Sequence, residues 1–129
     1  LTLEQVKEVY RLFRIAEAPL VTALLQGLGR SKKIRILGHD DADSSISCVV
    51  RLPTISFLHE TIPPDRIVMV CEGYGISCRC SSFLCTTNLA EELRFDHSEG
   101  FVRVSLAHYN TLAEIDTFFK AVSSIPGWF

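Results

Sequence analysis

The chain has 129 residues, of which 47% are hydrophobic and 22% are charged, a composition that supports one hydrophobic core and excludes intrinsic disorder. A chain of this length buries about two-thirds of the surface that it exposes when unfolded, so one domain spanning residues 1–129 needs no disulfide or metal for stability. The 13 Lys and Arg residues against 15 Asp and Glu residues give a net charge of −2, which provides no positive field for nucleic acid.

The sequence carries no visible targeting or membrane signal. No positively charged start precedes an apolar stretch, and the apolar runs are too short to cross a bilayer. The five cysteines form no C-x-x-C pair, which favours free thiols in a reducing compartment. We therefore expect a cytoplasmic protein, and the start at Leu1 suggests a processed terminus or a piece of a longer protein.

The first expected element is a long helix over residues 3–28, because apolar residues recur there every three or four positions. Thr2, followed three residues later by Gln5, is typical of a capping box. Pro19 lacks a backbone N–H, so we expect a kink or a second helix starting there. Gly27 and Gly29 are expected to end the helix.

Four strands and three further helices are expected after this helix. Turn residues and caps separate apolar segments of alternating or helical period. Pro53 cannot donate a hydrogen bond to a sheet, so we expect a bulge or a sheet edge near residues 51–54. The expected strands cover residues 32–38, 46–58, 76–80 and 101–106. The first of the expected helices begins at residues 63–65 and ends at Gly73 or Gly75. The second is capped at one of residues 86–88 and runs through Leu93, and the last is capped by Asn110 or Thr111 and runs to Val122.

The order α-β-β-α-β-α-β-α predicts an α/β protein of the two-layer, α+β sandwich type. Its small sheet of about four strands, mixed or antiparallel, should be covered by helices, because the first two strands are joined without a helix.

Two groups of side chains contain possible metal ligands, one of histidine and aspartates and one of cysteines. The loop His39, Asp40, Asp41 and Asp43 lacks the spacing, the central Gly and the terminal Glu of a calcium loop, so it is interpreted as a solvated turn.

The second cluster is the C-x-C-x4-C grouping of Cys78, Cys80 and Cys85. On a strand the first two point to one face and form no zinc knuckle, so they are interpreted as small hydrophobic side chains and no metal is expected. Cys85 lies near a strand-to-helix turn, where a helix N-terminus lowers a thiol pKa, so it is a candidate nucleophile.

Arg103 lies within the apolar strand pattern F-V-R-V-S. A guanidinium inside such a strand is costly unless it meets a carboxylate or a phosphate. The simplest interpretation is an arginine on the solvent face that pairs with a surface acid.

Three segments carry a resemblance to a known family, and this resemblance suggests a different role for Arg103. They are Arg51–Phe57 (R-L-P-T-I-S-F), Gly75–Arg79 (G-I-S-C-R) and Val102–Asp116 (V-R-V-S-L-A-H-Y-N-T-L-A-E-I-D). In this order they resemble the C-terminal small domain of class V aminotransferases, and most closely the cysteine desulfurase and selenocysteine lyase group. Residues 1–30 resemble the helix that leads in from the large domain, so the resemblance covers nearly the whole chain.

The resemblance implies a domain of a pyridoxal-phosphate-dependent transferase or lyase of fold type I. The small domain would close over a cofactor held by the large domain of the same parent chain, and the parent would be a homodimer. Arg103 stands where the family binds the α-carboxylate of the amino-acid substrate, and Asn110 and Thr111 are interpreted as structural caps of the last helix.

Two departures from the family pattern limit what is carried over. Counted from Arg79, the position of the desulfurase nucleophile falls on Leu84, with Cys85 one residue later. The Schiff-base lysine and the phosphate-binding residues belong to the large domain in this family, so the isolated chain is expected to be inactive. Two alternatives stay open: a non-catalytic interaction module with the same fold, and a sulfur-relay domain that uses Cys85.

Overall fold

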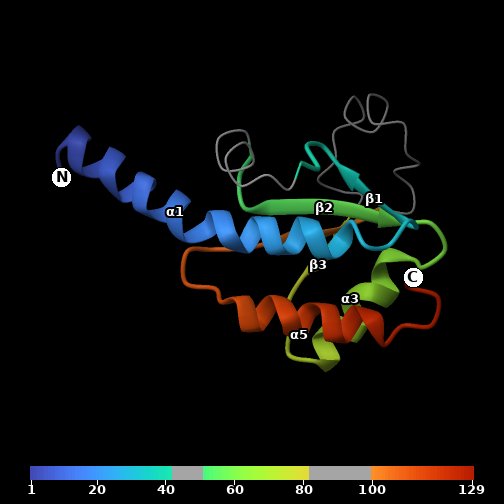
Figure 1. Cartoon of the computed structure of the whole chain (residues 1–129). Coiled ribbons are helices and arrows are strands. Elements are labelled where there is room, and N and C mark those ends of the chain that lie inside the picture. Colours follow the sequence, from blue (N-terminus) through green and yellow to red (C-terminus); the bar gives the residue numbers. More distant parts are fainter. Residues whose placement is uncertain (42–50, 82–99) are drawn as a thin grey trace.

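The computed structural model describes residues 1–41, 51–81 and 100–129, and it opens with the long helix α1, Leu3–Leu28. The predicted capping box is confirmed: the Thr2 Oγ1 atom accepts from the Gln5 N–H at 3.3 Å, and the Gln5 Oε1 atom accepts from the Thr2 N–H at 2.8 Å. One helix passes through Pro19, so the second helix considered there is wrong. Figure 1 shows the axis of α1 changing direction about halfway along its length.

The expected range of α1, residues 3–28, is confirmed, and of the two glycines expected to end the helix only Gly29 does so. The helix continues to Leu28 and is capped by Gly29, whose N–H donates to the carbonyl of Leu25 at 2.9 Å. A contact between α1 and another helix explains why position 27 is a glycine. A Cβ atom there would lie 2.0 Å from the Cζ atom of Phe119, so the absence of a side chain lets another helix approach.

The sheet has four strands, β1 (Ile34–Leu37), β2 (Thr54–His59), β3 (Arg79–Ser81) and β4 (Phe101–Ser105). All neighbouring pairs are antiparallel, and the order across the sheet is β1-β2-β4-β3. The predicted α+β sandwich with an antiparallel sheet is therefore confirmed.

Two strand predictions need correction. Pro53 makes neither a bulge nor an edge, because β2 begins after it at Thr54 and is paired on both sides. The first residues of the expected strand, 46–50, lie outside the described residues. The third strand begins at Arg79 and not at Ile76, because Ile76 takes part in the turn that ends the preceding helix.

The helices α3 (Pro64–Gly73) and α5 (Leu112–Ser123) complete the described part of the fold. Figure 1 shows α1, α3 and α5 on the same side of the sheet. Thr111 caps α5 through a second capping box with Glu114, as predicted. The helix expected at residues 88–93 lies outside the described residues.

The core lies between this helix layer and one face of the sheet. Alternate strand residues Ile55, Phe57, Val102 and Val104 are buried against side chains of the three helices. α1 contributes only its C-terminal part: its buried residues are Leu20, Val21, Leu24, Leu25 and Leu28. The N-terminal part of α1 extends past the sheet (Figure 1).

The C-terminus is fastened to the end of the sheet by polar contacts. Trp128 is buried, and its carbonyl accepts from the Ser31 hydroxyl at 2.7 Å. The same carbonyl lies 3.1 Å from the Nε2 atom of His59. The Nδ1 atom of His59 accepts the N–H groups of Thr61 and Ile62, each at 3.1 Å, so the ring is the tautomer that carries its proton on Nε2 and donates it to Trp128.

Candidate functional site

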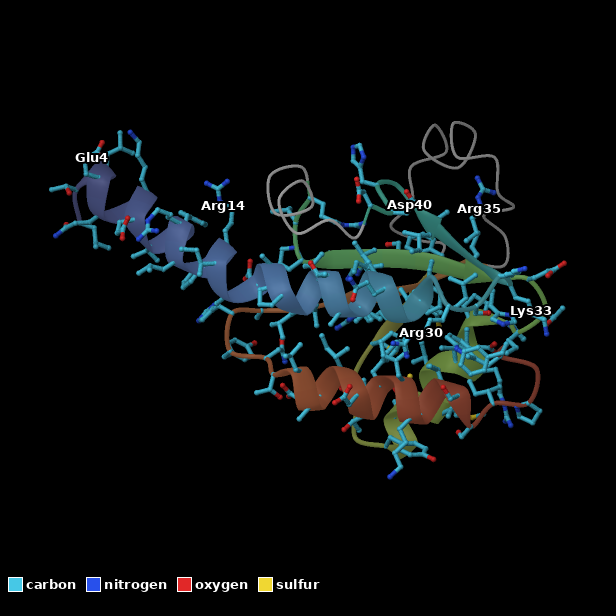
Figure 2. The ribbon with its side chains drawn as sticks, in the orientation of Figure 1. Glu4, Arg14, Arg30, Lys33, Arg35 and Asp40 are labelled. Carbon is cyan, nitrogen blue, oxygen red and sulfur yellow. The ribbon has the colours of Figure 1, made fainter. Side chains whose placement is uncertain are left out.

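The face of the sheet that points away from the helices carries Arg103. Because register partners share a face, Leu37, Ser56, Arg103 and Arg79 form one row across the four strands. The next row on this face contains Arg35, which Figure 2 shows pointing away from the helix layer. We call this side of the sheet the open face, with reference to the described helices.

Arg103 is half-buried at the centre of the row. In the part of the chain that the structure describes, its guanidinium forms no ion pair or side-chain hydrogen bond. The simplest sequence-based interpretation, pairing with a surface acid, therefore finds no support among residues 1–41, 51–81 and 100–129. A half-buried cation without a counter-ion is costly, which makes this position suited to an anionic ligand.

Arg79 is the register partner of Arg103 on β3. Directly opposed residues of an antiparallel pair have Cβ atoms about 5 Å apart, and like charges at such positions repel. Sequence analysis used Arg79 only to align the desulfurase loop and missed this pairing. The only signal was a second arginine in a strand-like segment, and the register that joins the two arginines depends on tertiary structure.

Arg51 lies at the edge of the same region, before β2. Its guanidinium donates to the carbonyl of His39 and, at 3.1 Å, to that of Thr54, so it joins the loop after β1 to the start of β2. Partial burial lowers the pKa of Arg51, and the nearby Asp40 carboxylate opposes this shift. Its buried Nε atom has no hydrogen-bond partner among the described residues. These contacts give Arg51 a structural role.

The turn from β4 into α5 is held by side-chain hydrogen bonds. The Oδ1 atom of Asn110 accepts from the Ala107 N–H at 2.7 Å, and the Glu114 carboxylate accepts from the Thr111 N–H at 2.7 Å. These bonds to Thr111 and Asn110 lower the pKa of Glu114. The capping role predicted for Asn110 and Thr111 is confirmed. His108, in the same turn, stacks on Phe13 of α1 with ring centroids 4.0 Å apart.

Several predicted site residues lie outside the described residues, namely Cys85, Leu84 and Asp43. His39, Asp40 and Asp41 follow β1 and are exposed. Within the described ranges no group of three or more His, Cys, Asp or Glu side chains is arranged to hold a metal ion.

A carbonyl cofactor is held through a lysine amine, and the structure describes all four lysines of the chain. Lys7 lies on the projecting part of α1 and pairs with Glu4 at 3.0 Å, and Lys33 donates to the carbonyl of Gly127 at 2.9 Å. Lys32 and Lys120 are exposed, before β1 and on α5. None belongs to the row of Arg103, so the lysines of this chain do not fit the role of a Schiff-base residue.

The helices in the described part of the chain do not combine the length and the apolar composition that a bilayer crossing requires.

Comparisons with known proteins identify similar sequences and a similar fold. No family model matches the chain. The chain is 28% identical to the aminotransferase-like protein FGM3 of Gibberella zeae, over 95% of the chain and 29% of that relative. It is 31% identical to the uncharacterized protein MT3887 of Mycobacterium tuberculosis, over 58% of the chain and 18% of that relative.

Among solved structures, the cysteine desulfurase CsdA of Escherichia coli (S-sulfonic acid form) matches with a TM-score of 0.64 and 22% identity, over 83% of this chain and 23% of that one. The chain thus spans less than a third of the length of each of these proteins. The likeness to CsdA establishes the fold, and the likeness to FGM3 connects the sequence to an aminotransferase-like protein. Together they confirm the resemblance of this chain to the C-terminal domain of class V aminotransferase-like enzymes.

Proposed function

We propose that the chain is the C-terminal small domain of a larger pyridoxal-phosphate-dependent enzyme of the class V aminotransferase type, and that Arg103 binds the α-carboxylate of its amino-acid substrate. The observation that carries the proposal is the position of Arg103. It is half-buried at the centre of the open face and has no counter-ion in the described part of the chain.

The chemistry of the arginine pair favours a carboxylate over a neutral ligand. A guanidinium is planar and always charged, and it binds a carboxylate through two parallel hydrogen bonds. Arg79, opposite Arg103, adds a second positive charge. A bound carboxylate reduces the repulsion between the two guanidinium groups, so it supplies the counter-ion that Arg103 lacks among residues 1–41, 51–81 and 100–129.

The cofactor supplies the electron sink for amino-acid chemistry when it is bound. Because no lysine of this chain fits the Schiff-base role, the residues that hold the cofactor would belong to the large domain. The contribution of this chain is then to cover the site and to orient the substrate through Arg103. By itself the chain should neither retain the cofactor nor turn over substrate.

The N-terminal part of α1 supports a connection to a large domain. Leu3, Leu12 and Ile15 are 68%, 51% and 59% exposed, although leucine and isoleucine are usually buried. This part of the helix projects beyond the sheet (Figure 1). We assign residues 1–30 as the segment that leads in from the large domain and packs partly against it.

The test uses the full-length parent protein with Arg103→Ala and, as a matched control, Arg66→Ala. Arg66 lies on α3, in the helix layer on the other side of the sheet. Loss of a bidentate, charge-assisted contact costs on the order of 2–4 kcal/mol, which corresponds to a roughly 30- to 1,000-fold weaker affinity for the amino acid. The control should bind like the unsubstituted protein.

The measurement is a titration of the cofactor absorbance with amino acid, so it also reports whether the cofactor is retained. A folded, cofactor-loaded Arg103→Ala parent with unchanged affinity would refute the role of Arg103. A parent that never binds the cofactor would favour the alternative, a non-catalytic interaction module with the same fold.

A further inference from the structure

Two of the described cysteines lie at opposite ends of one tight turn. Cys71 is in the last turn of α3 and is completely buried. Cys78 precedes β3, is half-buried and packs against the core cluster. The third described cysteine, Cys80, is exposed on β3.

The backbone between Cys71 and Cys78 forms a Schellman motif. Gly75 has a φ of 75°, in the left-handed region, and its N–H donates to the carbonyl of Glu72 at 2.9 Å. The N–H of Ile76 donates to the carbonyl of Cys71, also at 2.9 Å. This pair of bonds is the signature of the motif. The chain therefore reverses direction at the end of α3, and Cys78 packs against the same core cluster that contains Cys71.

The Cys71 and Cys78 side chains interact with each other, and this interaction shifts their two pKa values in opposite directions. It raises the pKa of Cys71, which burial raises further. It lowers the pKa of Cys78, although burial and the Glu72 carboxylate oppose the shift. Cys78 is half-buried whereas Cys71 is completely buried, so an external disulfide reaches Cys78 more easily. Because the thiolate is the nucleophile in exchange with disulfides, we expect Cys78 to attack first and Cys71 to resolve.

We infer that Cys71 and Cys78 form a reversible disulfide by exchange with a low-molecular-weight disulfide such as oxidised glutathione, and that this bond closes the turn between α3 and β3. The inference is independent of the proposed function, since it uses only contacts inside this chain.

The disulfide forms in two thiol–disulfide exchange steps. The Cys78 thiolate attacks one sulfur of oxidised glutathione, a bond forms between that sulfur and the Cys78 Sγ atom, and glutathione leaves as a thiolate. Cys71 then loses its proton to the released thiolate, and its Sγ atom attacks Cys78 Sγ and displaces the second glutathione, which takes up the proton given up by Cys78. Two protein thiols are oxidised to one disulfide, and one oxidised glutathione is reduced to two glutathiones.

The test treats the reduced, folded 129-residue chain with oxidised glutathione, quenches with acid and maps the linked peptides by mass spectrometry. We expect one main product that lacks two hydrogen atoms, contains a Cys71–Cys78 cross-link and reverts on addition of dithiothreitol. Cys78→Ser should abolish the cross-link. Cys80→Ser is the matched control, two residues away, and should leave the yield within about twofold of the original.

A second variant tests the order of attack. In Cys71→Ala, which removes the resolving thiol, the mixed disulfide of Cys78 with glutathione should accumulate, provided that circular dichroism shows a folded chain. Three results would overturn the inference: no Cys71–Cys78 peptide from the folded chain, a cross-link that forms only in urea, or a product dominated by any other cysteine pair.

Discussion

Adding one methyl group at Gly27 tests the contact between α1 and α5. A Cβ atom at this position would lie 2.0 Å from the Cζ atom of Phe119 and within 2.7 Å of the two neighbouring ring atoms. Real Cβ contacts of this kind do not occur, so the Phe119 ring or the helix must move in Gly27→Ala. Forcing an additional carbon into a packed contact costs about 1–3 kcal/mol.

A second effect acts in the opposite direction. Gly27 is inside α1, and replacing a helix-interior glycine by alanine stabilises by about 0.5–1 kcal/mol. The clash is the larger effect, because the ring of Phe119 is half-buried and not free in solvent. We therefore expect Gly27→Ala to lower the free energy of unfolding by about 0.5–2 kcal/mol.

The assay is urea unfolding of the 129-residue chain followed by circular dichroism. Gly73→Ala is the matched control: Gly73 also lies in a helix, but nothing is found within 4 Å of its added Cβ atom, so this variant should be neutral or slightly more stable. Phe119→Leu in the Gly27→Ala background should recover part of the loss. If Gly27→Ala is as stable as the unsubstituted chain, the close packing of α1 on α5 is refuted.

Three further outcomes follow from the contacts of the other elements. Trp128 is 1% exposed, so Trp128→Ala should lower the free energy of unfolding by about 3–5 kcal/mol, and an unchanged urea midpoint would show that the C-terminus is not fastened to the sheet. Thr111→Ala removes the N-cap of α5 and should cost about 1 kcal/mol, whereas Thr2→Ala, at the projecting end of α1, should cost less in the same assay. The pKa of Glu114 is lowered in the folded chain, so its stabilising effect is present above the ordinary carboxyl pKa and is lost as the pH falls through the lowered value. Comparing urea midpoints from neutral to acid pH, Glu114→Gln should reduce this loss, and an identical pH dependence would contradict the assignment.

Local patterns were reliable where the controlling interactions are close in sequence. The capping box at Thr2 was predicted because a hydroxyl and a glutamine three residues apart satisfy each other, and Thr111 was predicted as a cap of the last helix. The strand at Phe101–Ser105 followed from strict alternation. The resemblance that marked Arg103 also depended on a continuous motif, and both comparisons support the relationship it indicated.

The differences between expectation and structure have more than one physical cause. Gly27 was expected to end α1, but what requires a glycine there is the ring of Phe119, 92 positions away along the chain (119 minus 27). Pro53 was placed inside a strand because the apolar run around it continues, whereas the ladder begins only at Thr54. For Gly27 a contact between distant segments decides the outcome, and a pattern in one segment does not contain that contact.

The sequence alone predicted the α+β class and the start of both capped helices, because propensity, capping and periodicity act over a few residues. The motif around Arg103 added a resemblance to class V aminotransferases. Only the tertiary structure decided which residues meet. Strand register places Arg79 opposite Arg103, and Cys78 packs against the core cluster that contains Cys71. The backbone carbonyl of Trp128 contacts both Ser31 and His59. Contacts of this kind depend on how chain segments pack against one another, and packing is a property of the whole domain.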